Sequence, residues 1–265
     1  MAAMGADWAD FNRDGFLDLT VTDFQKNCFA LYRNEGAGFF VEVGNMTGLS
    51  LTTCDRLGFG AKWLDMDNDR WPDICFANGH VYDNVSEIEG RAVQFRQPIM
   101  LFRSHEGKRF TDLAPALDPS VVRPLVGRGS ASADFNRDGR TDVFVVDYEG
   151  PPLLLENRSQ TANHWLTLEL RAAAPNVFAY GARAVGRHGG ETWVGQVSPA
   201  SSYLSSSDLE IHWGLGGFDH LDKLTIHWPS GAEQTFENVA ADQFLRLTEG
   251  QRSGSEPAEA PTKQR

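Results

Sequence analysis

The acidic segment Asp10–Asp18 reads DFNRDGFLD and recurs twice, as DMDNDRWPD at Asp65–Asp73 and as DFNRDGRTD at Asp134–Asp142. Each copy carries oxygen-bearing side chains at its first, third, fifth and ninth positions. Side chains at alternating positions of a curled loop converge on one point, and Ca²⁺ requires several oxygen ligands. A backbone carbonyl at the seventh position would add one more. The spacing therefore predicts up to three Ca²⁺ sites.

The predicted ligands are the same positions in each copy. They are Asp10, Asn12, Asp14, Asp18 and the carbonyl of Phe16; Asp65, Asp67, Asp69, Asp73 and the carbonyl of Trp71; and Asp134, Asn136, Asp138, Asp142 and the carbonyl of Arg140. Gly15 and Gly139 stand at the sixth position, where a sharp turn favours positive φ. Arg70 replaces that glycine and Pro72 stiffens the loop, so the site at 65–73 is the weakest match of the three.

Two other structures could account for acidic loops of this kind. An EF-hand needs a Glu at the twelfth position and a helix on each side, but the chain has Val21, Phe76 and Val145 there, within strand-like runs. An acidic turn without metal is the simpler alternative, because Asp, Asn and Gly form turns readily. Three copies with one spacing favour metal loops over simple turns.

The runs that flank each loop are short, apolar and separated by turns, and they repeat with the loops. Four such strands form one blade of a β-propeller. The sequence predicts an all-β chain: a partial β-propeller of about three four-stranded blades in residues 1–160, then a small β-sandwich-like domain in 163–250. A polar insertion covers residues 80–98. The tail, residues 251–265, is rich in Ser, Pro, Glu and Gly and is predicted to be disordered.

Composition limits the possible partners and compartments. The net charge of −12 argues against a nucleic-acid partner, and no apolar run is long enough to span a bilayer. The start lacks the basic and apolar regions of a signal peptide, so we expect an N-terminally truncated chain. The three cysteines form no C-x-x-C motif. The sequence leaves open whether Cys28 and Cys54 form a disulfide, and Cys75 is expected to be a buried thiol.

Several motifs together resemble a known family. The acidic loops, each between a glycine-led strand and an apolar strand, look like FG-GAP or VCBS repeats. The segments NHWLTLELR (163–171), GAR (181–183), SSYLSSSD (201–208), WGLG (213–216) and HWPSG (227–231) are similar to the ASPIC/UnbV domain. Repeats followed by that domain resemble the cartilage acidic protein family and its bacterial relatives. The resemblance implies a Ca²⁺-binding β-propeller, usually exported, followed by a small β domain.

The expected number of blades is too small for a closed propeller, which needs about four to eight. Either the missing blades lie in an upstream part of a longer protein, or the chain forms an open arc with exposed sheet edges. Because exposed edges are a liability, the first interpretation is favoured.

Two functions fit these features. The first is a calcium-stabilised, non-catalytic scaffold that binds a protein or glycan and is extracellular, periplasmic or on the cell surface. The alternative is an extracellular enzyme acting on a polysaccharide or another polymer. Its candidate residues, His80, Asp83, His188 and Glu210, are scattered, and no G-x-S-x-G motif is present. Turnover of a glycan panel would favour the enzyme, and saturable binding without turnover the scaffold.

For the histidines near the C-terminus and for a serine-rich segment, a structural role is favoured over a functional one. His212, His220 and His227 could form a zinc cluster, but packed or exposed strand histidines are much commoner. The hydroxyl-rich segment SPASSYLSSSD (198–208) is predicted to hydrogen-bond its own backbone.

Overall fold

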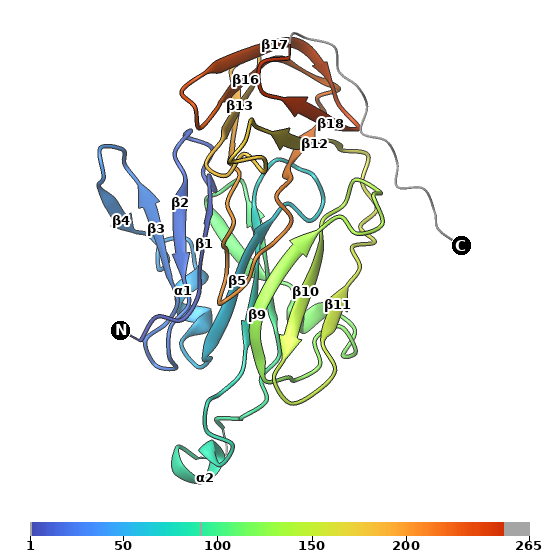
Figure 1. The fold of residues 1–265 in the computed structure, drawn as a ribbon. Helices are drawn as coiled ribbons and strands as arrows, with labels where there is room; N and C mark the ends of the chain where they lie inside the picture. The colour runs from blue at the N-terminus through green and yellow to red at the C-terminus, as the bar shows by residue number, and fades with distance from the viewer. Residues whose placement is uncertain (1, 91, 252–265) are drawn as a thin grey trace.

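The computed structural model describes residues 2–90 and 92–251. These residues form an all-β fold of five small sheets in a propeller-like, five-blade arrangement (Figure 1). The predicted all-β class is confirmed. The prediction of about three blades followed by a sandwich-like domain differs in detail, because the chain beyond residue 163 forms two separate sheets. Most of the predicted tail lies outside the described residues.

The first three sheets are antiparallel meanders of consecutive strands. The first contains β1 (Ala6–Ala9), β2 (Asp18–Val21), β3 (Ala30–Asn34) and β4 (Phe40–Glu42); the second contains β5 (Gly58–Leu64), β6 (Asp73–Asn78), β7 (Met100–His105) and β8 (Arg109–Asp112); the third contains β9 (Gly127–Ala133), β10 (Asp142–Asp147) and β11 (Leu153–Leu155). Short helices lie between strands: α1 (Leu49–Thr53), α2 (Val85–Ile88) and the 3₁₀ turn η1 (Ala114–Ala116).

The last two sheets, here called the C-terminal sheet pair, are built from interleaved strands. One has the order β15-β12-β18, from Ile211–Gly216, His164–Arg171 and Gln243–Thr248; the other has the order β14-β13-β16-β17, from Glu191–Gln196, Arg183–His188, His220–His227 and Glu233–Ala240. Strands β12 and β18 pair in parallel. One apolar cluster, with Leu168 and Trp213 from one sheet and Ala184 and Leu224 from the other, joins the pair.

Strand β6 connects two hydrophobic cores. Its side chains Ile74 and Phe76 pack with residues of the first sheet, whereas Cys75 and Ala77 pack with residues of the third. Successive side chains of a strand point to opposite faces, so a continuous apolar run is required where both faces are covered. This explains why the run DICFAN is apolar at its four inner positions, Ile74 to Ala77.

The serine-rich segment between β14 and β15 runs down beside the first strands of the first three sheets (Figure 1). The backbone of Ser202 pairs with Ala6, next to β1's start. Its hydroxyl oxygen accepts hydrogen bonds from the N–H of Ala61 at 3.1 Å and of Ser130 at 3.2 Å. Ser207 likewise accepts from the N–H of Ser132. The predicted bonding within the segment is present, since the hydroxyls of Ser198, Ser205 and Ser206 donate to carbonyl oxygens of the same segment. The segment also ties three sheets together, which the sequence did not indicate.

Two glycines make this close approach possible. A Cβ atom at Gly129 would lie 2.2 Å from the hydroxyl oxygen of Ser205, and one at Gly60 would lie 2.8 Å from the carbonyl oxygen of Arg128. Such separations are too short for any side chain. Gly60 is therefore required by the packing of β5 against β9, and Gly129 by the packing of the serine-rich segment against β9.

Cys28 and Cys54 form a disulfide across a sequence separation of 26 residues. The pair closes a loop that contains β3, β4 and α1. Cys75 is a free, fully buried thiol, as predicted.

Removing the disulfide should destabilise the first sheet. A closed loop of this length restricts the unfolded chain by about 3–4 kcal/mol in the loop-entropy model. We therefore expect a Cys28→Ser/Cys54→Ser double variant to lose a similar free energy of unfolding, measured by urea denaturation. As a control, dithiothreitol should lower the stability of the wild type and leave the double variant unchanged. Equal effects of the reductant on both proteins would contradict the disulfide.

Candidate metal centres

The three acidic loops occupy equivalent places in the first three sheets. Asp10–Asp18 connects β1 to β2, Asp65–Asp73 connects β5 to β6, and Asp134–Asp142 connects β9 to β10. The predicted strand–loop–strand context is therefore present in all three copies. All three loops lie at the ends of their sheets that face the C-terminal sheet pair (Figure 1).

The first carboxylate of each loop closes a tight turn by accepting two backbone hydrogen bonds. The donors are always the fifth and sixth residues: Asp14 and Gly15 at 3.0 and 2.9 Å from Asp10, Asp69 and Arg70 at 3.0 and 2.7 Å from Asp65, and Asp138 and Gly139 at 3.0 and 2.7 Å from Asp134. The second copy therefore has the same fold as the others, despite its different sequence.

The ninth carboxylate of each loop is buried and fastens the loop to its own sheet. It accepts one hydrogen bond from the second residue of the loop and one from a residue farther along the chain. For Asp18 the donors are Phe11 and Asn34, for Asp73 Met66 and Ser104, and for Asp142 Phe135 and Asn157, at 2.7–3.2 Å. The exposed fractions of these aspartates are only 0%, 2% and 3%.

The sixth position needs a left-handed backbone in every copy. Its φ is +92° at Gly15, +81° at Gly139 and +85° at Arg70. A residue with a side chain pays about 1–2 kcal/mol for this conformation. The Arg70 side chain offsets part of that cost, because its guanidinium lies over the Phe218 ring at 5.1 Å and 3.4 Å from Glu191.

The loop carboxylates are electrostatically strained without a cation. Burial, with neighbouring carboxylates, raises the pKa of Asp10 to about 6 and those of Asp18 and Asp73 to about 7. The same two causes raise the pKa of Asp65 well above its ordinary value. A divalent cation beside these groups would reverse both effects, since it favours the ionised carboxylate.

The second copy gives the most convergent carboxylates. One oxygen atom each from Asp65, Asp67 and Asp73 lies within 4.8 Å of the others. Oδ1 of Asp67 is buried and has no hydrogen-bond partner among residues 2–90 and 92–251. A shielded, unpaired oxygen inside a ring of carboxylates fits a hard cation, although this copy was the weakest match to the sequence pattern.

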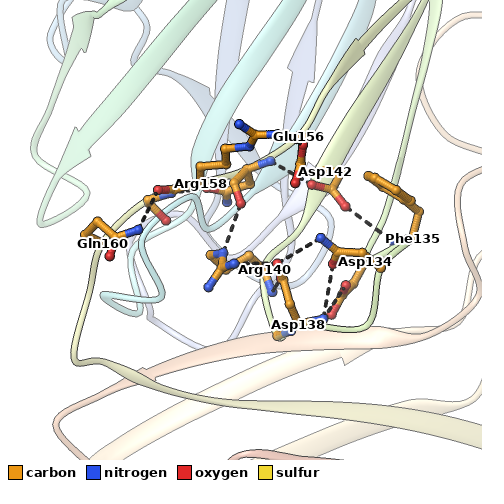
Figure 2. A network of polar contacts seen from close by, with 12 residues as sticks. Asp134, Phe135, Asp138, Arg140, Asp142, Glu156, Arg158 and Gln160 are labelled. Atoms are coloured by element: carbon orange, nitrogen blue, oxygen red, sulfur yellow. Dashed lines mark hydrogen bonds and ion pairs between the residues drawn. The ribbon is translucent and has the colours of Figure 1, made fainter. Parts of the chain in front are cut away.

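Arginines partly neutralise two of the loops. Arg103 forms an ion pair with Asp67 and lies 3.9 Å from Asp69. In the third copy Arg140 forms an ion pair with Asp138, and Figure 2 shows this pair beside Asp134 and Asp142. These arginines would compete with a bound cation at the third and fifth positions. The carbonyl ligands predicted at Phe16, Trp71 and Arg140 stay a prediction, as does the complete ligand set.

The fourth position of the loops has a role that the sequence interpretation missed. Arg13, Asn68 and Arg137 have positive φ values of 62°, 56° and 56°, so the loop projects these side chains outward. Each of them contacts the C-terminal sheet pair. The sequence contains one weak signal for this role: the fourth residue is a long or hydrogen-bonding side chain in all three copies.

The two arginines combine an ion pair with a ring contact. Arg13 lies 2.8 Å from the carboxylate of Glu191, and its guanidinium stands 4.9 Å from the ring centre of Trp193. Arg137 lies 3.4 Å from Glu210 and stands 3.7 Å from the ring centre of Phe244. Cations over aromatic rings contribute about 0.5–2 kcal/mol each, more when shielded from water.

Asn68 makes the most buried of these contacts. Its side-chain oxygen lies 2.9 Å from Nε2 of His212, and its backbone oxygen accepts from the N–H of Gly216 at 2.9 Å. Nδ1 of His212 lies 2.8 Å from the hydroxyl of Thr167. Burial lowers the pKa of His212 to about 4, so its imidazole is neutral at physiological pH and links the second loop to β12 and β15.

A cavity of about 580 Å³ lies where these parts meet. The first carboxylates of two loops, Asp10 and Asp65, line it together with the Asp7–Lys62 ion pair, whose atoms are 2.9 Å apart, and the Trp193 ring. The cavity therefore connects two acidic loops with the C-terminal sheet pair.

The scattered candidates for catalysis are not joined by any described contact. His80 packs against the rings of Phe24 and Tyr82, and Glu210 pairs with Arg137. Asp83 lies in the insertion beside α2. His188, at the end of β13, instead meets His220 and Asp222.

The three histidines considered for zinc do not converge. His220 and His227 are the two ends of β16, so roughly 23 Å separates them at about 3.3 Å per residue. His212 is engaged by Asn68 on a different sheet.

Comparison with known proteins agrees with this architecture. Residues 10–76 match the family model described as FG-GAP-like repeat, and residues 172–254 match the model described as ASPIC and UnbV. The first match includes two of the acidic loops, and the third lies outside it. The chain thus combines an FG-GAP-like repeat with an ASPIC/UnbV region, and the resemblance drawn from its motifs is confirmed.

The chain is also homologous to cartilage acidic protein 1. It is 25% identical over 239 residues to that protein from Xenopus tropicalis, 24% over 253 residues to that from Mus musculus and 25% over 255 residues to that from Homo sapiens. These alignments cover 86–92% of this chain but only 34–36% of the relatives. The chain therefore spans about a third of the length of the curated relatives it matches.

No helix within residues 2–90 and 92–251 is long and apolar enough to cross a membrane.

Replacing Arg137 should weaken the contact between the third loop and the C-terminal sheet pair. An Arg137→Ala variant loses the ring contact and leaves Glu210, whose side chain is only 14% exposed, without its cation. We expect a loss of about 1–3 kcal/mol in the free energy of unfolding by urea denaturation. Arg158→Ala is the matched control, because the Arg158 side chain is 78% exposed and pairs with Glu156 at the surface. Similar losses in both variants would contradict the docking role.

The raised pKa of Asp18 predicts a pH-dependent stability of the calcium-free protein. Because the folded-state pKa of about 7 exceeds that of an unfolded Asp, the folded protein holds more protons than the unfolded chain between about pH 4 and 7. The free energy of unfolding therefore falls as pH rises through that window.

The measurement compares wild type with Asp18→Asn in EDTA. Asparagine cannot ionise, so the wild type should lose on the order of 4 kcal/mol relative to the variant between pH 4 and 7.5. Millimolar Ca²⁺ should abolish this relative loss. A wild type that gains stability over the variant as pH rises in EDTA would contradict the analysis.

Proposed function

We propose that this chain is a calcium-stabilised, non-catalytic extracellular scaffold in which three metal loops hold the C-terminal sheet pair on the propeller sheets. The observation that supports this proposal is the shared geometry of the loops. In each one, buried carboxylates surround the turn while the fourth residue contacts the C-terminal sheets.

The residues of the loops fit this role. The first and ninth carboxylates already hold the backbone in its turn, and the third and fifth side chains are exposed or partly buried. Bound Ca²⁺ would supply positive charge and oxygen coordination at the centre of each loop. The carboxylates could then stay ionised without mutual repulsion, and Arg13, Asn68 and Arg137 would be held in their contacts.

Two features support an oxidising compartment rich in calcium. The Cys28–Cys54 disulfide is typical of extracellular and periplasmic proteins. Loops of this kind in extracellular modules bind Ca²⁺ with Kd of about 10⁻⁴–10⁻³ M, a range that matches extracellular calcium. The curated relatives carry the name cartilage acidic protein.

The outer faces of the first and third sheets support a larger propeller. Trp8 and Phe40 are 49% and 41% exposed on the first sheet, and Phe144 and Val146 are 41% and 43% exposed on the third. Blades pack face to face through such residues. We propose that residues 1–160 supply about three blades, that further blades of a longer protein cover these faces, and that residues 163–250 form the ASPIC/UnbV-like domain.

The insertion that contains α2 projects from the end of the second sheet opposite the metal loops (Figure 1). Its Tyr82 side chain is 56% exposed. We propose this end, which the C-terminal sheet pair does not cover, as the surface for a protein or glycan partner, since binding residues commonly lie on loops held by a rigid scaffold.

Calcium should stabilise the folded chain through the fifth position of the loops. At a Ca²⁺ concentration of ten times Kd, one site contributes about 1.4 kcal/mol, which corresponds to about 3–6 °C in melting temperature for a chain of this size. We expect Asp14→Ala and Asp138→Ala to lose this increment in Ca²⁺ and to lose much less in EDTA, measured by thermal denaturation.

Asp55→Ala is the matched control, because the Asp55 side chain is 71% exposed and lies outside the loops. Its melting temperature should rise with Ca²⁺ as that of the wild type does. Losses of equal size with Ca²⁺ and with EDTA in the loop variants would refute the calcium role.

A further inference from the structure

The register of β13 and β16 brings two histidines and an aspartate together on the C-terminal sheet pair. Arg187 of β13 pairs with Lys223 of β16 in an antiparallel ladder. The next position along the ladder places His188 opposite Asp222. His220 precedes Asp222 by two residues and therefore shares its face of the sheet. Three side chains that can bind a metal thus meet at one end of the ladder.

The separations of their ligand atoms match a tetrahedral metal site. Nδ1 of His188 lies 3.4 Å from Oδ1 of Asp222, and Nε2 of His220 lies 3.3 Å from the same oxygen. A zinc ion with ligand bonds of about 2.0–2.1 Å requires ligand atoms roughly 3.4 Å apart when its geometry is tetrahedral. One ligand atom from each of the three residues lies within 4.8 Å of the others.

The state of the His188 ring distinguishes this cluster from the other histidine–carboxylate pairs of these sheets. Those pairs range from 2.6 Å at His220–Asp219 to 3.3 Å at His227–Glu233, so the case for a metal rests on the convergence of three ligand atoms and on an unpartnered nitrogen. Nδ1 of His188 is shielded from solvent and has no hydrogen-bond partner in the described part of the chain. A shielded nitrogen without a donor or acceptor is a plausible metal ligand.

A second layer of hydrogen bonds holds the ligands in position. The Asp219 carboxylate engages Nδ1 of His220 and so directs Nε2 toward Asp222. The N–H of Gly189 donates to the other oxygen of Asp222, Oδ2, at 2.8 Å. Histidine ligands of zinc commonly hold a carboxylate on their second nitrogen in this manner, which fixes the ring and increases its basicity.

From this geometry we infer that His188, His220 and Asp222 form a zinc-binding site with a fourth position open to water. The site differs from the acidic loops in ligand chemistry, since imidazole nitrogens select zinc over calcium. It also lies beside the contact with the second loop. The centre of the Phe218 ring is 4.5 Å from that of the His188 ring and 5.1 Å from the guanidinium of Arg70.

The test is calorimetric titration of the full chain with Zn²⁺ in 5 mM Ca²⁺, which keeps the acidic loops filled. We expect one Zn²⁺ per chain. His188→Ala, His220→Gln and Asp222→Asn should each weaken binding by at least tenfold, and Asp219→Asn by about 10–100-fold because it acts through His220. Co²⁺ in place of Zn²⁺ should give the visible absorption of a tetrahedral site, and this absorption should disappear in Asp222→Asn.

His227→Ala is the matched control. His227 lies on the same strand and forms a comparable ion pair with Glu233 at 3.3 Å, but it is at the opposite end of β16. Its variant should bind Zn²⁺ as the wild type does. Because the Asp222 side chain is 51% exposed, Asp222→Asn should retain the far-ultraviolet circular dichroism of the wild type and keeps the test valid if a histidine variant misfolds.

Three results would overturn the inference. They are the absence of stoichiometric Zn²⁺ binding, wild-type affinity in Asp222→Asn or His220→Gln, and a zinc signal that is lost in Asp14→Ala but kept in these variants. The first two results do not bear on calcium binding, because the two sites share no residue. The third would place the zinc in the first acidic loop instead.

Discussion

The carboxylate that closes the turn of each acidic loop is the interaction on which the other contacts depend. Asp10, Asp65 and Asp134 bind two backbone N–H groups each, and this turn makes the fourth residue adopt a left-handed backbone. The fourth side chain then projects toward the C-terminal sheets. The same geometry brings several carboxylates close together. Their burial and their mutual repulsion both raise the pKa values of the loop aspartates. The same feature therefore gathers negative charge in the loop and creates a docking contact.

The C-terminal sheets are attached in two ways that reinforce each other. At the ends of the propeller sheets they rest on the fourth residues of the loops, and farther down the segment that contains Ser202 follows the inner strands. Displacing the sheets would break both sets of contacts together. Polar backbone groups along β5 and β9 would then lose their partners, which costs about 1–3 kcal/mol for each buried group left unpaired.

The three loops are equivalent in fold but not in electrostatics. Arg103 approaches the carboxylates of the second copy and Arg140 those of the third. In the first copy the loop arginine, Arg13, is directed to Glu191 instead. Arginine therefore neutralises part of the carboxylate charge in the second and third loops. The second loop nevertheless places three carboxylates closest together. Arg70 of this loop adopts a left-handed backbone that favours glycine, and the contact of its guanidinium with the Phe218 ring offsets part of the cost.

The sequence by itself determined the features that depend on neighbouring residues. The spacing of Asp10 to Asp18 specifies a turn with converging oxygens, and alternating apolar residues specify strands, because both patterns act over fewer than ten positions. The tertiary structure alone decided the partners. The Cys28–Cys54 bond, the contact of Asn68 with His212 and the meeting of His188 with Asp222 join residues 26, 144 and 34 positions apart. Such contacts depend on strand register and sheet packing, and these are set by the free energy of the whole fold.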